Sequence, residues 1–287
     1  MDSITLPAPA KLNLFLHITG RREDGYHTLQ TVFQLLDISD QLTFTPSGNN
    51  EISFTCSNPD LESADNLVMQ AARLLWQESG ITRGTAIHLD KSLPLGAGVG
   101  GGSSDAATTL LALNRLWNCQ LSLDELAQMG LSLGADVPVF IRGRSAWAED
   151  VGETLQALDL PERWYLVLTP DCHVSTGEIF SHPQLTRHTH PIKIAAFPFP
   201  GSKNDCEMLV CDLYPSIKKA RDWLSGYADT RMTGTGSSLF AAFDSKQEAQ
   251  RVLDLVPGQL PGIAKAFVAR GVNESPLHQA LNELNIE

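Results

Sequence analysis

The sequence predicts a mixed α+β fold built as two domains. Its 287 residues are more than one hydrophobic core usually organises. A hydrophobic content of 43% and a charged content of 19% are typical of a globular chain. Strand-like and helix-like apolar patterns alternate without the steady rhythm of βαβ units, which favours α+β over doubly wound α/β. We expect an N-terminal domain over residues 1–157 and a C-terminal domain over residues 158–287.

Alternating apolar residues indicate the first strands. The segment Lys11–Ile18 has leucines and an isoleucine at every second position, which predicts a strand. Gln41–Thr45 and Glu51–Thr55 flank a Pro-Ser-Gly-Asn-Asn turn and therefore predict a β-hairpin. Thr85–Leu89 predicts a short strand that leads into a glycine-rich stretch.

Capping residues and helical spacing indicate the helices of the same half. Asp65 and Asn66 precede a helical pattern that ends at Gly80. Beyond the glycine-rich stretch, apolar residues recur at helical spacing as far as Trp117. The run Ser-Leu-Asp-Glu at residues 122–125 is a capping-box pattern and predicts a further helix.

The C-terminal half shows strands and helices in a less regular order. Strands are predicted at Trp164–Leu168, Ser238–Phe243 and Ile263–Val268. The segment His182–Pro200 has the composition of an irregular surface insertion. Its histidines have no acidic or cysteine partner at ligand spacing, so we interpret it as a solvated loop and not as a metal site.

Charge and cysteine content exclude several classes of protein. A net charge of −12 argues against nucleic acid or an anionic membrane surface as the main partner. The five cysteines are odd in number and form no C-x-x-C motif, which indicates reduced thiols in a cytoplasmic protein. The N-terminus lacks the basic region of a signal peptide, and no apolar run approaches the length of a membrane span.

The stretch PLGAGVGGGSSDAA, residues 94–107, has five glycines among seven residues and leads into a helix. A flexible linker would not be followed at once by a strong helical pattern. The stretch fits G-x-G-x-x-G, but it lacks the strand context of a dinucleotide fold, and no G-K-[S/T] closes a Walker A loop. We favour a phosphate-binding loop at a helix N-terminus, where backbone N–H groups and the helix dipole attract an anion.

The acidic residue after the two serines leaves two arrangements open. Ser103 and Ser104 offer hydroxyls to the helix cap, to a phosphate or to a metal ion. Asp105 would repel a nearby phosphate, so it either points away from the ligand or has Mg²⁺ between them. The ligands of that Mg²⁺ stay unknown at this stage.

Three motifs in this order resemble those of the GHMP kinase superfamily. The central one is Pro94–Ala107, the first is PAKLNLFL at residues 9–16, and the third is MTGTGSS at residues 232–238. The resemblance covers nearly the whole chain and implies a two-domain GHMP kinase fold with ATP and Mg²⁺ as cofactors. The residues that it assigns to ATP are Pro94, Leu95, Gly96, Ala97, Gly98, Val99, Gly100, Gly101, Gly102, Ser103 and Ser104, with Asn66 and Lys91 on the adenosine side.

Finer features resemble the branch of that superfamily that phosphorylates a CDP-linked methylerythritol on the non-mevalonate route to isoprenoids. They are GRR-x-DGYH at residues 20–27, GADVPVF at residues 134–140 and the pair Asn204-Asp205. The alternatives are another GHMP kinase, of the homoserine or mevalonate type, and a catalytically silent nucleotide-binding protein. One departure from the branch is Asp150, which stands where a glycine is usual.

The resemblance also implies the catalytic pair. Asp136 matches the aspartate that takes the proton of the acceptor hydroxyl. From the residues alone, a helix cap before Pro138 is the stronger interpretation of Asp136. Lys11 matches the lysine beside that aspartate, although a lysine on an apolar strand more often extends its ammonium to solvent.

Aromatic residues are implied for the cytidine. Tyr26 and Phe180 match the rings that enclose the cytosine, and His27 matches the residue that hydrogen-bonds its edge. Asn13 and Thr176 match residues near the ribose or the phosphates of the substrate. Core packing is the structural alternative for Phe180. A capping or solvated role is the alternative for Asn13, Thr176, Asn66 and Lys91.

Overall fold

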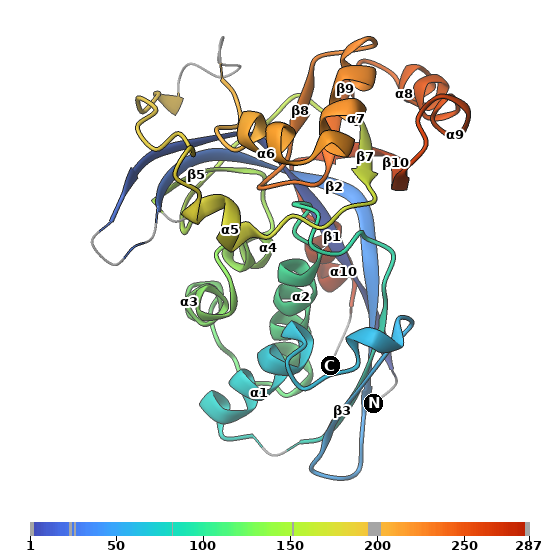
Figure 1. The fold of residues 1–287 in the computed structure, drawn as a ribbon. Coiled ribbons are helices and arrows are strands. Elements are labelled where there is room, and N and C mark those ends of the chain that lie inside the picture. The colour runs from blue at the N-terminus through green and yellow to red at the C-terminus, as the bar shows by residue number, and fades with distance from the viewer. Residues whose placement is uncertain are drawn as a thin grey trace.

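The computed structural model describes residues 3–22, 25, 27–81, 83–150, 152–194 and 202–284. Figure 1 shows long curved strands that run through the molecule, with one group of helices beside their lower part and another group above. The strands are β1 (Ile4–Arg21), β2 (His27–Pro46), β3 (Ile52–Cys56), β4 (Thr85–Asp90), β5 (Ala146–Asp150), β6 (Thr154–Ala157), β7 (Trp164–Pro170), β8 (Thr230–Met232), β9 (Leu239–Phe243) and β10 (Ile263–Val272).

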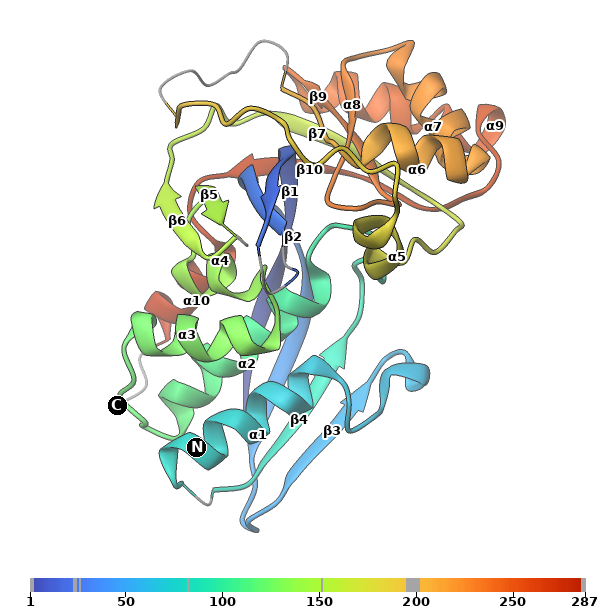
Figure 2. The same cartoon turned by 60° about the vertical axis from the view of Figure 1, so that its left-hand side comes forward.

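The helices divide between the two groups. Their bounds are η1 (Pro59–Leu61), α1 (Leu67–Ser79), α2 (Gly101–Leu116), α3 (Leu123–Leu133), α4 (Val137–Arg142), α5 (Thr176–Ser181), α6 (Glu207–Leu213), α7 (Pro215–Ser225), α8 (Lys246–Leu253), α9 (Val256–Gln259) and α10 (Pro276–Glu283). Figure 2 shows α1 to α4 on one side of β1 and β2, with α6 to α9 at the opposite end of the molecule. The predicted mixture of helices and strands is confirmed.

A single path of paired strands joins both halves. Its order is β3-β4-β2-β10-β7-β9-β8, while β1 and β5 also pair with β2, and β6 pairs with β5. The junction is short: β10 pairs with β2 through Gly271 opposite Leu36 and Val272 opposite Leu35. All of these pairs are antiparallel except β3 with β4. This largely antiparallel pairing suits an α+β fold.

The predicted hairpin between residues 41–45 and 51–55 is wrong. β4 lies between β2 and β3, antiparallel to the first and parallel to the second. The alternate residues Thr85, Ile87 and Leu89 of β4 are each 1% exposed, so β4 has the burial of an interior strand. The turn also bonds to the chain that enters β4, because Ser47 N donates to Gly84 O at 3.1 Å. A turn signal shows where the chain reverses, but burial decides which strand becomes the neighbour.

The other predicted elements are confirmed with adjusted bounds. Asn66 caps α1 by accepting a hydrogen bond from Val68 N, and Gly80 ends the helix at φ 66°. Both hydrogen bonds of the predicted capping box are present between Ser122 and Glu125 at the start of α3. The strand predicted from residue 11 is longer than expected, since β1 covers Ile4–Arg21. Strands β7, β9 and β10 lie at the predicted positions.

Two hydrophobic clusters fill the two ends of the molecule, and the chain crosses between them. The N-terminal cluster includes Leu110 and Leu113 of α2, and it also receives Leu277 and Leu281 from α10. The C-terminal cluster contains Leu168 of β7 and, from the first strand, Leu16 and Ile18. The boundary at residue 157 stays a prediction, and the final helix packs with the first half. None of the helices in the described ranges combines the length and the apolarity that a membrane crossing requires.

Candidate active site

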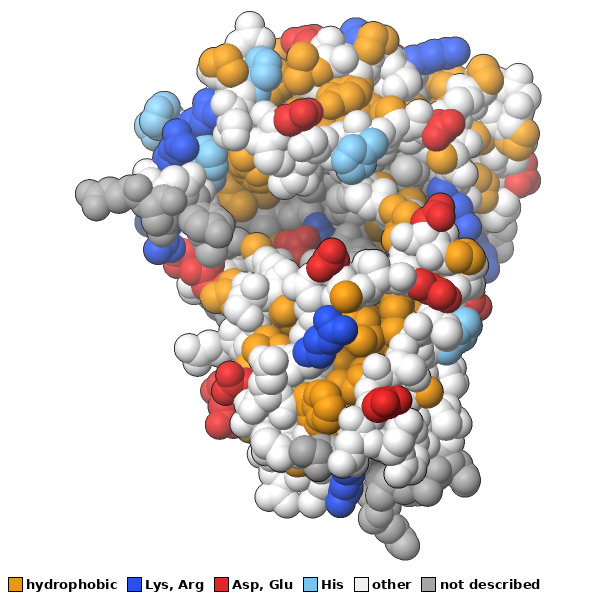
Figure 3. Space-filling model, turned by 60° about the horizontal axis from the view of Figure 1, so that its bottom comes forward, with side chains coloured by type: hydrophobic (Ala, Val, Ile, Leu, Met, Phe, Trp, Pro, Cys, Tyr) orange, Lys and Arg blue, Asp and Glu red, His pale blue; other side chains and the backbone are white. Residues whose placement is uncertain are grey.

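A cavity of about 570 Å³ opens between the glycine-rich loop and α5. Figures 1 and 2 both show α5 next to the N-terminal end of α2. Figure 3 shows a hollow in the molecular surface, with acidic, basic and histidine side chains in and around it. The residues that line the cavity and carry polar side chains are Lys11, Asn13, Thr31, Ser103, Asp136, His173, Ser175, Thr176 and Thr235.

The glycine-rich loop is held against both halves of the chain. Lys11 N donates to Val99 O at 2.9 Å, and Ser238 N donates to Ala97 O at 3.1 Å. Gly98 has φ +79°, and a Cβ at this position would lie 2.2 Å from Thr233 O. A side chain would therefore separate the loop from the turn that begins at Thr233.

The loop ends at the N-terminus of α2. Gly100 is the N-cap residue with φ 76°, and it makes no side-chain capping hydrogen bond. The first backbone N–H groups of a helix have no partner within the helix. Here they belong to Gly101, Gly102 and Ser103, which all line the cavity. This end of α2 thus presents neutral donors and the positive end of the helix dipole to an anion.

Most residues predicted to bind ATP lie on the cavity, but not all of them do. Those that line it are Pro94, Gly96, Ala97, Gly98, Gly100, Gly101, Gly102 and Ser103. Val99 and Ser104 are buried, and Leu95 is 51% exposed. Neither Asn66 nor Lys91 lines the cavity, whereas Leu67 does. Asn66 is instead the capping residue of α1.

Lys91 belongs to a buried cluster of charges beside the loop. Its Nζ lies 2.5 Å from Asp40 Oδ2 and 2.6 Å from Asp105 Oδ2, and all three side chains are 5% exposed or less. Burial alone would lower the pKa of Lys91, but the carboxylates of Asp105 and Asp40 outweigh it and the net shift is upward. Burial raises the pKa of Asp105 to about 7, although the charge of Lys91 opposes this shift. The sequence left open whether Asp105 points away from the ligand or has Mg²⁺ beside it. In the structure its carboxylate points to Lys91 and away from the cavity.

This cluster also fixes the chain just before the loop. Asp40 Oδ1 accepts hydrogen bonds from the backbone N–H groups of Ser92, at 2.5 Å, and Leu93, at 2.7 Å. A Cβ added at Gly101 would lie 3.0 Å from Lys91 Nζ. The cluster therefore contacts both the entry of the loop and the first turn of α2.

Lys11 and Asp136 face each other in the cavity. Lys11 Nζ lies 3.0 Å from Asp136 Oδ2, and the two side chains are 2% and 33% exposed. The same ammonium donates to Asn13 Oδ1 at 2.6 Å and to Gly98 O at 3.1 Å. Asp136 occupies the N-cap position of α4 but makes no side-chain capping hydrogen bond. The capping interpretation of Asp136 is therefore wrong, because its carboxylate turns to Lys11 instead.

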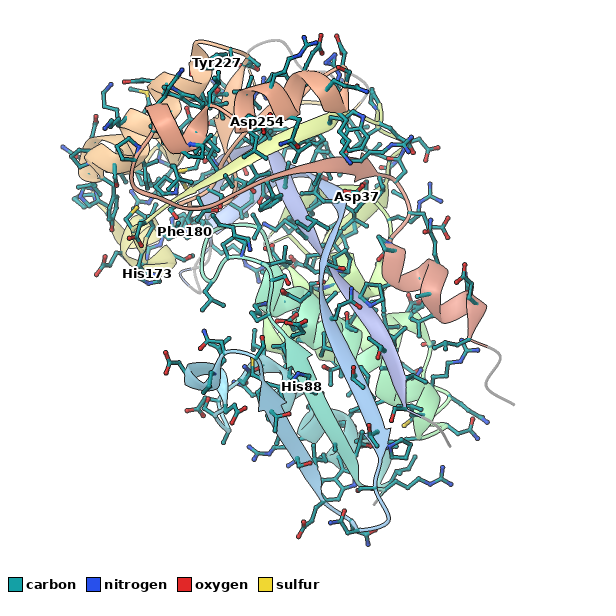
Figure 4. All side chains as sticks on the ribbon, turned by 90° about the vertical axis from the view of Figure 1, so that its right-hand side faces the viewer. Asp37, His88, His173, Phe180, Tyr227 and Asp254 are labelled. Atoms are coloured by element: carbon teal, nitrogen blue, oxygen red, sulfur yellow. The ribbon has the colours of Figure 1, made fainter. Side chains whose placement is uncertain are left out.

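The opposite wall of the cavity comes from α5. Phe180 lines the cavity, and its ring stacks on that of His27 with a centroid distance of 5.2 Å and an interplanar angle of 29°. Thr176 also lines the cavity, and its Oγ1 lies 2.9 Å from Thr235 Oγ1. Figure 4 shows Phe180 together with His173 at the lower edge of the C-terminal elements. Tyr26 lies outside the described residues.

Comparisons with known proteins identify the family of this chain. The model of the GHMP kinases N terminal domain matches residues 66–144, and that of the GHMP kinases C terminal domain matches residues 202–261. The chain is 50% identical to the 4-diphosphocytidyl-2-C-methyl-D-erythritol kinase of Hahella chejuensis, over 99% of this chain and 97% of the relative. It is 53% identical to the enzyme of the same name from Nitrosococcus oceani, over 96% and 98% of the two chains. The chain belongs to the GHMP kinase family.

Two solved structures share the fold of this chain. A 4-(cytidine 5'-diphospho)-2C-methyl-D-erythritol kinase matches with a TM-score of 0.81 and 32% identity, over 94% of this chain and 100% of the other. The homoserine kinase of Cytophaga hutchinsonii matches with a TM-score of 0.68 and 18% identity, over 96% of each chain. The second likeness shows the fold alone. Both the predicted family and the predicted fold are thus confirmed.

Several residues in or beside the cavity were missed by reasoning from the sequence. Thr233 and Thr235 belong to the third GHMP motif, so a signal for them was present. Thr233 Oγ1 donates to Gly98 O at 2.9 Å, and Thr235 lines the cavity. His173 lies 3.4 Å from a Cβ added at Gly96, and nothing in its sequence context marked it. Arg187 contacts His27, although it lies in the segment interpreted as a solvated insertion.

The structure shows how Asp150 can stand where a glycine is usual in this branch of the GHMP kinases. Asp150 adopts φ 61°, the left-handed conformation in which a glycine has no steric cost. Asp is one of the few other residues that visit this region, because its short side chain bonds locally. Here Asp150 Oδ2 accepts a hydrogen bond from Thr154 Oγ1 at 2.8 Å. The turn therefore keeps the backbone that a glycine would adopt, and the nearby Gly152 lines the cavity.

Proposed function

We propose that this chain transfers the γ-phosphoryl group of ATP to the 2-hydroxyl of 4-diphosphocytidyl-2-C-methyl-D-erythritol. The observation that carries this function is the identity of about half of all residues, over nearly the full length, with kinases of that name. The lining of the cavity supports it, since the glycine-rich loop, the pair of Lys11 and Asp136, and an aromatic wall formed by Phe180 with His27 stacked beside it meet there.

The glycine-rich loop would hold the triphosphate. A protein of net charge −12 repels an anion at long range, so capture depends on local donors. The N–H groups at the start of α2 supply such donors without adding a side-chain charge. Residues 94–104 remain our assignment for this site. The structure does not support a contact between Lys91 and the adenosine, because the Lys91 ammonium is paired with two buried aspartates.

Asp136 and Lys11 would perform the proton transfer. The acceptor hydroxyl oxygen attacks the γ-phosphorus, the bond from that phosphorus to the bridging oxygen breaks, and ADP leaves with the electron pair. Asp136 takes the proton of the hydroxyl. Lys11, 3.0 Å from the carboxylate, stabilises the negative charge that develops on the attacking oxygen. Asn13 holds the ammonium in place at 2.6 Å.

Mg²⁺ would arrive with the phosphates of ATP. Among the described residues there is no group of three or more His, Cys, Asp or Glu side chains that could hold a metal. Magnesium commonly keeps several waters and binds through substrate phosphates with only one or two protein groups. The Ser103 hydroxyl lines the cavity at the start of α2 and fits that role. The ion would neutralise charge on the transferred phosphoryl group.

The cytidine would bind at the aromatic wall. Phe180 offers a face for stacking on the cavity side, and His27 lies beside it. Tyr26 stays our candidate for the second ring of the enclosure. Thr176 and Asn13 line the space between this wall and the catalytic pair, where the ribose and the diphosphate would lie.

The competing functions differ in their acceptor. Homoserine and mevalonate have no base to stack, so Phe180 and His27 would serve no purpose for them. A silent nucleotide-binding protein would release no ADP with any acceptor.

All five cysteines are free, which supports our proposal that the protein works in the reducing cytoplasm.

An ADP-release assay with candidate acceptors tests the function. We expect ADP to form only with the CDP-linked methylerythritol, together with a phosphorylated product whose 2-hydroxyl is modified. ADP release with homoserine or mevalonate instead would assign the chain to another branch of the family. ATP binding without turnover on any of the three acceptors would support the silent protein.

A further inference from the structure

Arg187 joins the aromatic wall to the chain that follows α5. Its Nη2 donates to Phe180 O at 2.9 Å and to His182 O at 2.8 Å, and its Nη1 donates to Leu185 O at 3.1 Å. The remaining nitrogen, Nε, donates to His27 Nε2 at 3.1 Å. Three backbone carbonyls thus hold the guanidinium in one orientation, with Nε directed at the imidazole.

This contact decides which nitrogen of His27 carries a proton. A guanidinium has only donors and keeps its charge in proteins, so His27 Nε2 has to accept. A neutral imidazole has one accepting and one donating nitrogen, and the proton must therefore be on Nδ1. The ring is held neutral, because burial and then the charges of Arg187 and Arg21 lower the pKa of His27.

The orientation of the His27 and Phe180 rings places the Nδ1–H donor close to the plane in which a base stacked on Phe180 would lie. The imidazole lies 29° from parallel to the Phe180 ring, at a centroid distance of 5.2 Å. A base stacked on the free part of the Phe180 face would lie in nearly the same layer as the imidazole. The Nδ1–H bond lies in the plane of its ring, so it can meet the edge of such a base within that layer.

We propose that Arg187 is a positioning residue that makes His27 a hydrogen-bond donor and thereby selects cytosine over uracil. The inference rests on the proposed function, in which His27 contacts the base. Cytosine N3 has no hydrogen and accepts a bond from Nδ1–H. In uracil the same nitrogen carries a hydrogen, so two donors would face each other in a buried site. An unpaired buried donor of this kind costs about 1–3 kcal/mol, a roughly 5- to 150-fold preference.

The test compares cytidine-linked and uridine-linked methylerythritol as acceptors for the wild type and Arg187→Met. Without the guanidinium, His27 can carry its proton on either nitrogen and becomes able to accept from uracil. We expect the cytidine-to-uridine ratio of kcat/KM to fall by about 5-fold or more, with the KM for ATP unchanged. Arg144→Met is the matched control, since Arg144 pairs with Asp159 at an exposed position and should leave the ratio as it is.

Two results would overturn the inference while leaving the proposed function intact. One is an equal loss of both substrates in Arg187→Met, because a purely structural role would weaken both alike. The other comes from nitrogen NMR of the wild-type imidazole, which needs no variant and reports the tautomer directly. We expect the proton of His27 on Nδ1, and a proton on Nε2 would exclude the mechanism. Failure of the wild type to phosphorylate the cytidine substrate would instead remove the proposed function.

Discussion

Lys11 and Lys91 are both buried beside the glycine-rich loop, yet their surroundings differ. Their side chains are 2% and 5% exposed. Lys11 lines the cavity and pairs with Asp136, whose carboxylate is one third exposed. Lys91 is absent from the cavity lining and pairs with two carboxylates that are almost fully buried. The two lysines are therefore buried to a similar degree, but Lys11 can contact a ligand in the cavity and Lys91 cannot.

The difference shows how a lysine that can act on a substrate is distinguished from one that stabilises the fold. A carboxylate that remains open to the cavity can exchange a proton with a bound substrate, and its lysine acts on the same atoms. A carboxylate that already accepts from backbone N–H groups, as Asp40 does, has little capacity left for a ligand. We conclude that Lys91 positions the loop, while Lys11 serves the reaction proposed for the cavity.

Removing the open carboxylate should have the largest effect. In Asp136→Asn the amide cannot take the proton of the acceptor hydroxyl, and we expect kcat to fall by roughly 10²- to 10⁴-fold. Calorimetry should show little change in ATP affinity, because the loop and α2 are untouched. Turnover near the wild-type rate would contradict the proposed role of Asp136.

Removing each lysine should reduce the free energy of unfolding by a different amount. Lys91→Met leaves Asp40 and Asp105 buried without a cation, and breaking a buried pair costs about 3–5 kcal/mol. Lys11→Met leaves a carboxylate that water can reach, and its cost in the free energy of unfolding is nearer to that of a lost hydrogen bond, about 1–2 kcal/mol. Urea unfolding of both variants measures the two costs. Equal losses would mean that the exposure of the partner does not distinguish the lysines.

Neutralising one buried carboxylate should have the smallest effect, visible as a pH dependence. The pKa of Asp105 is raised from its usual 3.8 to about 7, so the folded protein binds this proton more tightly than the unfolded chain. Its contribution to stability is complete at low pH and is lost as pH rises toward 7. Asp105→Asn resembles the protonated form, so we expect the variant to gain stability relative to the wild type between pH 5 and pH 8.

Urea unfolding at the two pH values tests this last expectation. Asp124→Asn is the control, because the side chain of Asp124 is 79% exposed and its ion-pair partner Arg142 is also exposed to solvent. It should show the same pH dependence as the wild type. A stability difference between the wild type and Asp105→Asn that stays constant from pH 5 to pH 8 would show that Asp105 is ionised throughout and held by Lys91.

Local signals accounted for a large part of the fold. The cap at Asn66, the capping box at Ser122 and the end of α1 at Gly80 all lie where the sequence predicts them. Each depends on contacts within a few residues, which a linear pattern contains. The hairpin prediction failed because strand pairing depends on which strand buries its alternate residues. No turn motif records that choice.

The sequence by itself determined the glycine-rich loop, the helix that follows it and the resemblance that points to Lys11 and Asp136 as the candidate catalytic pair. These follow from glycine backbone freedom and from motifs that are short enough to read along the chain. Only the tertiary structure decided that Lys11 reaches the cavity, that Lys91 is enclosed by Asp40 and Asp105, and that Arg187 meets His27. The physical reason is that the role of a charged side chain depends on its partners and their access to water. Those partners come from other strands and helices, so their contacts exist only in the folded chain.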